Sequence, residues 1–212
     1  MDLTWLGYAA TRMRTRTAAV VMDPYDKSVG GTMGRPDAHI VTISHDDPMR
    51  NGVSGVAPAD GEPMVLVGPG EYEIRGVHVE GVRGWLAGDG DPAKRASTLW
   101  LFEAEQMRVA HLGGLGTAPV PAQLDVLSRA DIVIVPIALA GTLPADEAAK
   151  AVRAMEPSIV IPVGYDTSDE APLKAFVRAL GGTPEEPVGR FTINSRSFDG
   201  EKRRIVLLEA RA

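Results

Sequence analysis

Residues 38–51 read AHIVTISHDDPMRN and give the first indication of the fold. Its first part, residues 38–44, is a short apolar run rich in β-branched side chains, which is typical of a strand buried on both faces. The run leads directly into a polar loop that begins at His45. Proteins of the α/β class commonly carry functional side chains on such a loop. The stretch therefore predicts a buried strand followed by a candidate functional loop.

Strand patterns dominate the N-terminal half of the chain, and helix–strand units follow in the C-terminal half. Short apolar or alternating segments predict strands at 2–7, 12–17, 18–23, 63–67, 72–82, 98–103 and 107–112. Apolar residues at helical spacing predict helices at 121–129, 144–155 and 171–180. Buried strands are expected at 131–136 and 158–163, and closing strands at 190–194 and 204–209. This order predicts two sheets with helices outside them, in a single domain spanning 1–212.

Composition excludes several classes of protein. The chain has 212 residues, of which 44% are hydrophobic and 24% charged, as in an ordinary globular domain. Its formal net charge of −6 argues against nucleic acid as the main partner. Because cysteine is absent, disulfides, Cys-ligated zinc and thiol catalysis are excluded. We find neither an apolar signal core nor an apolar run of about 20 residues, so we expect a cytoplasmic protein that does not contact membranes.

Seven sequence blocks occur together in an order that resembles the metallo-β-lactamase superfamily, nearest its Zn-dependent hydrolase branch, which includes lactonase-like proteins. The resemblance implies an α/β (α+β) fold, a four-layer αββα sandwich with a metal site at one edge of the sheets. The blocks are WLGYAA at 5–10, DPY at 23–25, TISHDDPMRN at 42–51, GPGEYEIRGV at 68–77, RVAHLGGLG at 108–116, DIVIVPI at 131–137 and EPSIVIPVGYDT at 156–167.

The resemblance also implies a set of metal ligands, and this sequence departs from most of them. The loop of the family reads His-x-His-x-Asp-His, and His45 matches its first position. A further His of the family, expected near residues 85–89, has no counterpart here. The other ligand positions are occupied by residues of a different type, namely Asp47, Met49, Arg50, Gly114 and Gly164.

These replacements predict that a pair of zinc ions is not held. Catalytic zinc takes three protein ligands and a water, and His45 and Asp47 supply two. The thioether of Met49 is a poor zinc ligand, and the guanidinium of Arg50 stays charged. Unit charges about 4 Å apart at an effective dielectric constant of about 20 interact by about 4 kcal/mol, and a dication would be repelled roughly twice as strongly. We therefore expect no cofactor, and we expect Arg50 to pair with Asp46 or Asp47.

Two main functions stay open. In the first, the chain is not a working dinuclear zinc hydrolase and acts as a binding or assembly module. In the alternative, it is a hydrolase that uses zinc or another divalent metal at a mononuclear or non-standard site built from His45, Asp47 and His111. A third possibility is an anion pocket lined by Arg50 and His111, which makes a small anionic ligand a candidate partner. By resemblance alone, a homo-oligomer is also expected.

Two further groups of residues have both a functional and an ordinary interpretation. Tyr165 and Asp166 follow a predicted buried strand, where they either contact a ligand or belong to an ordinary loop. Arg12, Arg14 and Arg16 alternate along one strand. They form either a binding surface for phosphate or an acidic partner, or a solvated hairpin face.

Overall fold

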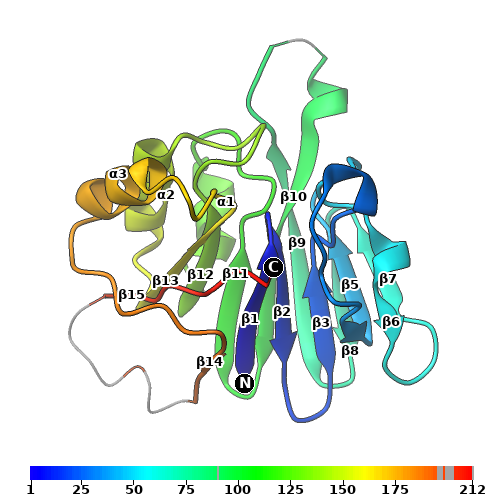
Figure 1. Cartoon of the computed structure of the whole chain (residues 1–212). Coiled ribbons are helices and arrows are strands. Elements are labelled where there is room, and N and C mark those ends of the chain that lie inside the picture. The colour runs from blue at the N-terminus through cyan, green and yellow to red at the C-terminus, as the bar shows by residue number, and fades with distance from the viewer. Residues whose placement is uncertain (90, 195–197, 199–202, 212) are drawn as a thin grey trace.

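The chain folds into two stacked β-sheets with three α-helices against the outer face of one of them (Figure 1). The computed structural model describes residues 1–89, 91–194, 198 and 203–211. One sheet has six strands and the other seven, and a two-stranded pair, β4 (Asp37–Ala38) and β6 (Ala57–Pro58), lies beside them. The predicted fold class is confirmed.

The six-stranded sheet is built from the N-terminal part of the chain and one strand near its end. Strand β1 pairs antiparallel with β2 and β14, and β2 pairs antiparallel with β3. Strands β3, β5 and β7 are parallel to one another. Because β7 is the last strand in the order of the sheet, it is an edge strand. In spatial order the strands are β14 (Phe191–Thr192), β1 (Asp2–Gly7), β2 (Ala10–Arg14), β3 (Ala19–Met22), β5 (Ile40–Ile43) and β7 (Met64–Val67).

The seven-stranded sheet combines an antiparallel half with a parallel half. Strands β8 to β11 are joined as antiparallel neighbours, whereas β11, β12, β13 and β15 run parallel. A short helix, η3 (Pro92–Arg95), lies between β9 and β10. In spatial order the strands are β15 (Arg204–Ile205), β13 (Ile159–Val163), β12 (Ile132–Pro136), β11 (Met107–His111), β10 (Ala96–Ala104), β9 (Val77–Trp85) and β8 (Gly70–Ile74).

The three α-helices cover the seven-stranded sheet. They are α1 (Pro121–Leu127), α2 (Ala145–Met155) and α3 (Ala171–Leu180), all close to their predicted bounds. Alternation along β12 explains the layering, because Val133 packs toward the helices and Ile134 toward the other sheet. Within the described residues, no helix is both long and apolar enough to cross a bilayer.

The outer face of the six-stranded sheet is covered differently. Two short 3-10 helices, η1 (Lys27–Val29) and η2 (Val53–Gly55), and the loops around them pack on this face. No α-helix of the described chain takes part in that cluster. The buried side chains of the cluster are Leu6, Ala10, Val21, Tyr25, Met33, Ala38, Val41 and Val56.

Strand β5 is buried on both faces, as its sequence predicted. Ile40 belongs to the core between the sheets, whereas Val41 belongs to the outer cluster, and both have 0% exposure.

The alternating segment predicted as one strand at 72–82 is instead a hairpin of β8 and β9. Its turn is made by Arg75 and Gly76, whose positive φ angles of 53° and 73° suit a tight hairpin connection. The predicted closing strands are also shorter than expected, at two residues each.

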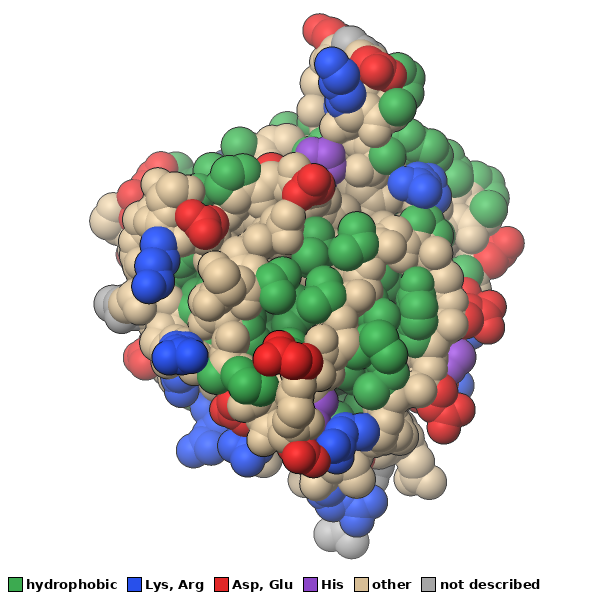
Figure 2. Space-filling model, turned by 90° about the vertical axis from the view of Figure 1, so that its right-hand side faces the viewer, with side chains coloured by type: hydrophobic (Ala, Val, Ile, Leu, Met, Phe, Trp, Pro, Cys, Tyr) green, Lys and Arg blue, Asp and Glu red, His purple; other side chains and the backbone are tan. Residues whose placement is uncertain are grey.

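One side of the molecule presents exposed hydrophobic side chains. Figure 2 shows them on the face that carries the edge strands β7 and β8. On β7, Met64, Val65 and Val67 are 53%, 40% and 62% exposed. An exposed edge strand with apolar side chains is a site at which another chain can pair.

Phe102 tests the core between the sheets. Its side chain is 0% exposed and belongs to the cluster that joins both sheets. We expect Phe102→Ala to lower the free energy of unfolding by about 3–5 kcal/mol, because it removes a buried ring and leaves a cavity. Urea denaturation measures the loss. The control Val120→Ala, at a side chain that is 48% exposed, should change stability by no more than about 0.5 kcal/mol. Similar losses in both variants would contradict this account of the core.

Candidate functional site

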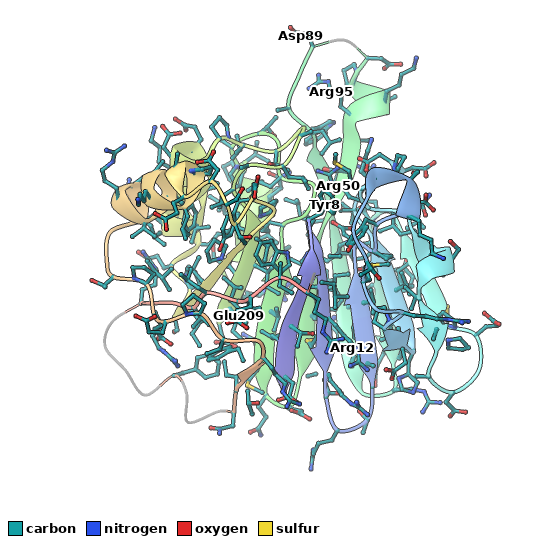
Figure 3. The ribbon with its side chains drawn as sticks, viewed as in Figure 1. Tyr8, Arg12, Arg50, Asp89, Arg95 and Glu209 are labelled. Atoms are coloured by element: carbon teal, nitrogen blue, oxygen red, sulfur yellow. The ribbon has the colours of Figure 1, made fainter. Side chains whose placement is uncertain are left out.

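Three loops meet at one end of the sandwich. The candidate loop follows β5, and it contacts residue 113 after β11 and residue 140 after β12. Arg50 makes both contacts, and Figure 3 labels it together with Tyr8 near this end of the sheets. A side chain of the six-stranded half thereby binds two loops of the seven-stranded half.

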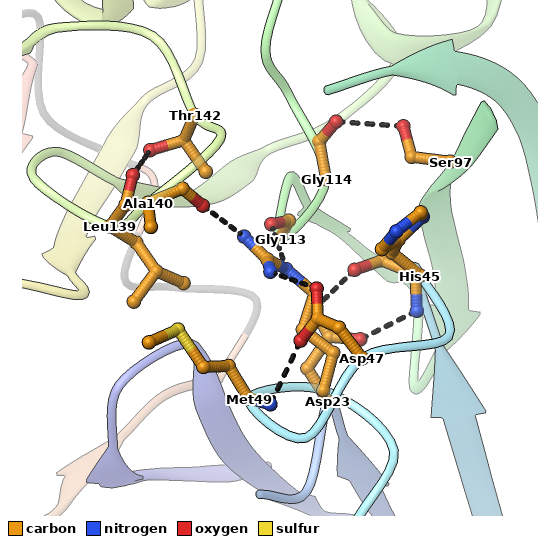
Figure 4. Close-up of polar contacts among 12 residues, drawn as sticks. Asp23, His45, Asp47, Met49, Ser97, Gly113, Gly114, Leu139, Ala140 and Thr142 are labelled. Carbon is orange, nitrogen blue, oxygen red and sulfur yellow. Dashed lines mark hydrogen bonds and ion pairs between the residues drawn. The ribbon is translucent and has the colours of Figure 1, made fainter. Parts of the chain in front are cut away.

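The guanidinium of Arg50 is buried, and each of its three nitrogens donates a hydrogen bond. The side chain is 1% exposed. Its Nε donates to Gly113 O at 3.0 Å, and its two terminal nitrogens donate to Asp47 Oδ2 at 2.6 Å and to Ala140 O at 3.1 Å (Figure 4). A buried charge is tolerated when it is paired and hydrogen-bonded in this way. The ion pair with Asp47 is one of the two pairings that the sequence predicted.

Asp47 is held by the same arrangement. Its second oxygen, Oδ1, accepts a hydrogen bond from Met49 N at 2.8 Å. Both carboxylate oxygens therefore have protein partners. Asp46 takes no part in the pair with Arg50, because its carboxylate accepts a hydrogen bond from the Asn51 amide instead.

The side chain of His45 contacts the backbone of Ala96 and takes no part in the Arg50–Asp47 pair. Its Nδ1 lies 2.9 Å from Ala96 O. Since a carbonyl oxygen only accepts, Nδ1 carries the hydrogen, and Nε2 is the ring nitrogen left for another contact. Together with Asp46, Arg83 and Lys94, His45 lines a surface cavity of about 330 Å³.

Beneath the loop lies a buried polar group in which His111 meets Asp23, a residue that the sequence analysis did not single out. Asp23 is 0% exposed and accepts two hydrogen bonds of 2.6 Å from Ser44, one from its backbone N and one from its Oγ. His111 is also 0% exposed, and its Nε2 donates to Ala9 O at 2.9 Å. Its Nδ1 lies 3.8 Å from Asp23 Oδ2. The DPY block at 23–25 was the available signal for this group.

Burial shifts both members of this group toward their neutral forms. Burial raises the pKa of Asp23, while the charges of His111 and Arg50 and the hydrogen bonds from Ser44 oppose the rise. Burial likewise lowers the pKa of His111, with Asp23 opposing. His111 is therefore a buried side chain whose neutral form is favoured, and its Nδ1 faces Asp23 without a hydrogen bond among the described residues.

The structure brings together some of the predicted site residues and separates others. Arg50 and Asp47 are paired, whereas His45 faces Ala96 and His111 faces Asp23. The described ranges contain no group of three or more His, Cys, Asp or Glu side chains that could hold a metal ion. The trio of His45, Asp47 and His111 is thus not assembled in this arrangement.

Tyr165 and Asp166 lie at a second cavity of about 480 Å³, which Met49 and Ala140 also line. The Tyr165 ring packs on Trp5 with ring centroids 5.1 Å apart. Asp166 is exposed and accepts hydrogen bonds from Ser168, and these bonds lower its pKa. Both residues have ordinary loop contacts here and also border a space that a ligand could enter.

Two glycines occupy expected ligand positions where the backbone leaves little room for a side chain. A Cβ at residue 114 would lie 2.6 Å from Ser97 Cβ, and Ser97 Oγ donates to Gly114 O at 2.7 Å (Figure 4). Gly164 has a φ of +67°, and a Cβ there would lie 3.0 Å from Pro136 Cβ. A larger side chain at either position requires its surroundings to move.

Comparison with known proteins agrees with the fold. Residues 2–164 match the beta-lactamase superfamily domain. A UPF0173 protein of Pyrococcus furiosus is 26% identical over 195 residues, which cover 85% of this chain and 90% of that protein. A UPF0173 metal-dependent hydrolase of Methanopyrus kandleri is 24% identical over 215 residues, covering 85% and 93%.

Solved structures show the same architecture. A Thermotoga maritima protein, described as a candidate Zn-dependent hydrolase of the metallo-β-lactamase superfamily, aligns with a TM-score of 0.78 at 25% identity, covering 99% of both chains. The metallo-β-lactamase fold protein YhfI of Bacillus subtilis aligns with a TM-score of 0.64 at 7% identity, covering 100% of this chain and 96% of that one. The chain belongs to the beta-lactamase superfamily and has the metallo-β-lactamase fold. The names of its relatives point to a divalent metal in the family.

The importance of Arg50 can be measured by Arg50→Met, which keeps an unbranched chain and removes the charge. Oδ2 of Asp47 and two carbonyl oxygens would lose the donors that Arg50 supplies. We expect the free energy of unfolding to fall by about 3 kcal/mol, because removing one partner leaves buried polar groups unpaired. Urea denaturation gives the value. The control Arg16→Met removes an arginine whose side chain is 89% exposed, so it should cost less than about 1 kcal/mol. Equal stability of Arg50→Met and the unaltered protein would refute the role of Arg50.

Proposed function

We propose that this member of the family uses the Arg50–Asp47 pair in place of a dinuclear metal centre and acts as a binding protein. The single observation that carries the proposal is the position of Arg50. Its buried cation contacts the loop after β5, the loop after β11 and the loop after β12 at once. In the family these loops supply metal ligands, as the resemblance implies.

The donor set supports this proposal over a metal-dependent one. Asp47 has both oxygens engaged, and Arg50 cannot lose its proton. Nε2 of His45 is then the one nitrogen or carboxylate ligand left at the four loop positions 45, 47, 49 and 50. A pair of dications needs several such ligands and no adjacent fixed cation. The residues present therefore do not fit a dinuclear centre.

Metal content of the purified full-length chain tests the proposal. We expect well under one equivalent of zinc, manganese or iron per chain after purification without chelators. Elemental analysis by mass spectrometry measures this content. Two equivalents that survive dialysis would overturn the proposal.

The alternative, a hydrolase with a mononuclear site, makes a different prediction. It requires about one equivalent of metal, and both the metal and any ester or lactone hydrolysis should disappear in His45→Ala. The control Lys94→Ala changes another residue of the same cavity and should keep both. Retention of about one equivalent in both variants would place the ion elsewhere and count against this alternative.

The anion pocket expected from Arg50 and His111 has weaker support. Both side chains are buried, at 1% and 0% exposure, and both face protein partners. An anion between them would have to displace the contacts of Arg50 and lie beside the buried Asp23. A binding site for a small anionic ligand is therefore better sought at a surface more exposed than Arg50 and His111.

Self-association stays a prediction, and β7 is the surface on which to test it. If two copies pair through this exposed edge, Val67→Lys should shift the chain toward monomer by placing a charge among apolar side chains. Light scattering after size-exclusion chromatography measures the mass. The control Val120→Lys introduces the same charge at a 48% exposed site outside β7 and should leave the mass unchanged. An oligomer that survives Val67→Lys would exclude this edge as its interface.

A further inference from the structure

Arg12 and Arg14, the two alternating arginines that belong to β2, lie on the outer face of the six-stranded sheet. Met13 lies between Arg12 and Arg14 on β2 and is paired with Leu3 of β1. Both Met13 and Leu3 are buried in the core at 0% exposure. Arg12 and Arg14 therefore point to the opposite face. In the register of β1 and β2, Arg14 lies opposite Asp2 and Arg12 opposite Thr4. Arg16 leaves this group, because it pairs with Glu105 at 3.6 Å.

Two more arginines reach the same place from the end of the chain. Strand β14 pairs with β1, which brings the preceding Arg190 beside Asp2. The C-terminal segment crosses β1 through a bridge between Ala210 and Trp5, and Arg211 N donates to Trp5 O at 3.1 Å. One cavity of about 420 Å³ is lined by all four arginines, and its full lining is Asp2, Thr4, Arg12, Arg14, Gly189, Arg190 and Arg211. We call it the arginine cavity.

Positive charge in the arginine cavity is incompletely balanced by the described residues. Arg12 pairs with Asp37 at 2.6 Å, and Arg190 lies 3.7 Å from Asp2. The side chains of Arg14 and Arg211 have no ion pair or hydrogen bond with any described residue. Glu209 lies near the arginine cavity, beside Gly189 of its lining. The Oε2 of Glu209 would be 3.4 Å from a Cβ placed on Gly189.

The arginines also repel one another. Burial lowers the pKa of Arg12, Asp37 opposes this, and the positive charges of Arg14 and Arg211 lower the pKa further. Like charges gathered at one point destabilise a fold unless an anion neutralises them. The chain as a whole has a formal net charge of −6, so this concentration of cations runs against its composition.

We propose that the arginine cavity binds the phosphate group of a small phosphorylated molecule. The planar guanidinium presents paired N–H donors that match phosphate oxygens, and arginine is favoured at such sites for this reason. A phosphate monoester carries a charge of about −1.5 to −2 near pH 7, which suits the unpaired Arg14 and Arg211.

The size of the cavity favours a small molecule over a polymer. Its volume of about 420 Å³ lies within the range of small-ligand sites, roughly 300–1,000 Å³. A nucleic-acid surface would instead need a long basic stripe and a basic net charge. Figure 3 shows Arg12 well away from Arg50 along the sheets, so this site is separate from the loop of Arg50.

Isothermal titration of the full-length chain tests the inference, with inorganic phosphate and AMP as probes and potassium chloride holding the ionic strength constant. We expect saturable binding of both probes. Because each charge contacts the phosphate directly, Arg14→Gln and Arg211→Gln should each weaken binding at least tenfold. The control Arg16→Gln removes the third arginine of the alternating series, which lies outside the cavity, and should leave binding within twofold.

Thermal stability separates binding from a structural role. Arg14→Gln and Arg211→Gln should have melting temperatures equal to or above that of the unaltered chain, because each change relieves repulsion. No saturable binding of either probe, or equal weakening by Arg16→Gln, would overturn the inference. Lower melting temperatures combined with unchanged binding would also overturn it, since they would make the cluster structural. Metal content tests the Arg50 site independently, so the two proposals can fail separately.

Discussion

The contact between one buried guanidinium and three loops is the constraint on which the candidate site depends. Arg50 satisfies two backbone carbonyls of the seven-stranded half while its charge is balanced by Asp47 in its own loop. A planar cation with several N–H donors can join such loops by hydrogen bonds alone. This arrangement joins the loops at the end of the sandwich through polar contacts. His45 and Met49 then line two different cavities.

The two-sheet core determines where that contact forms. Aromatic side chains such as Trp100 and Phe102 are fully buried between the sheets. Ser44 at the end of β5 binds Asp23, so the start of the loop is attached to the sheet below it. Loops after parallel strands gather at one end of the layers, and this common end explains why residues far apart in the sequence meet there.

The sequence predicted the elements whose signals are local. The apolar run of β5 and the proximity of opposite charges at Asp47 and Arg50 were visible in one short stretch, and both expectations agree with the structure. The hairpin turn at Arg75 was missed because alternation continues across it. The pairing of Asp23 with His111, and the meeting of Arg12 with Arg211, depend on long-range strand pairing, which periodicity does not encode.

The backbone at Gly164 and Gly114 has a consequence for how this chain can change over time. A histidine at the first would adopt a strained left-handed conformation, and an aspartate at the second would collide with Ser97. Either replacement made alone adds strain. A single substitution at either glycine would therefore be selected against unless Ser97 or Pro136 changed together with it.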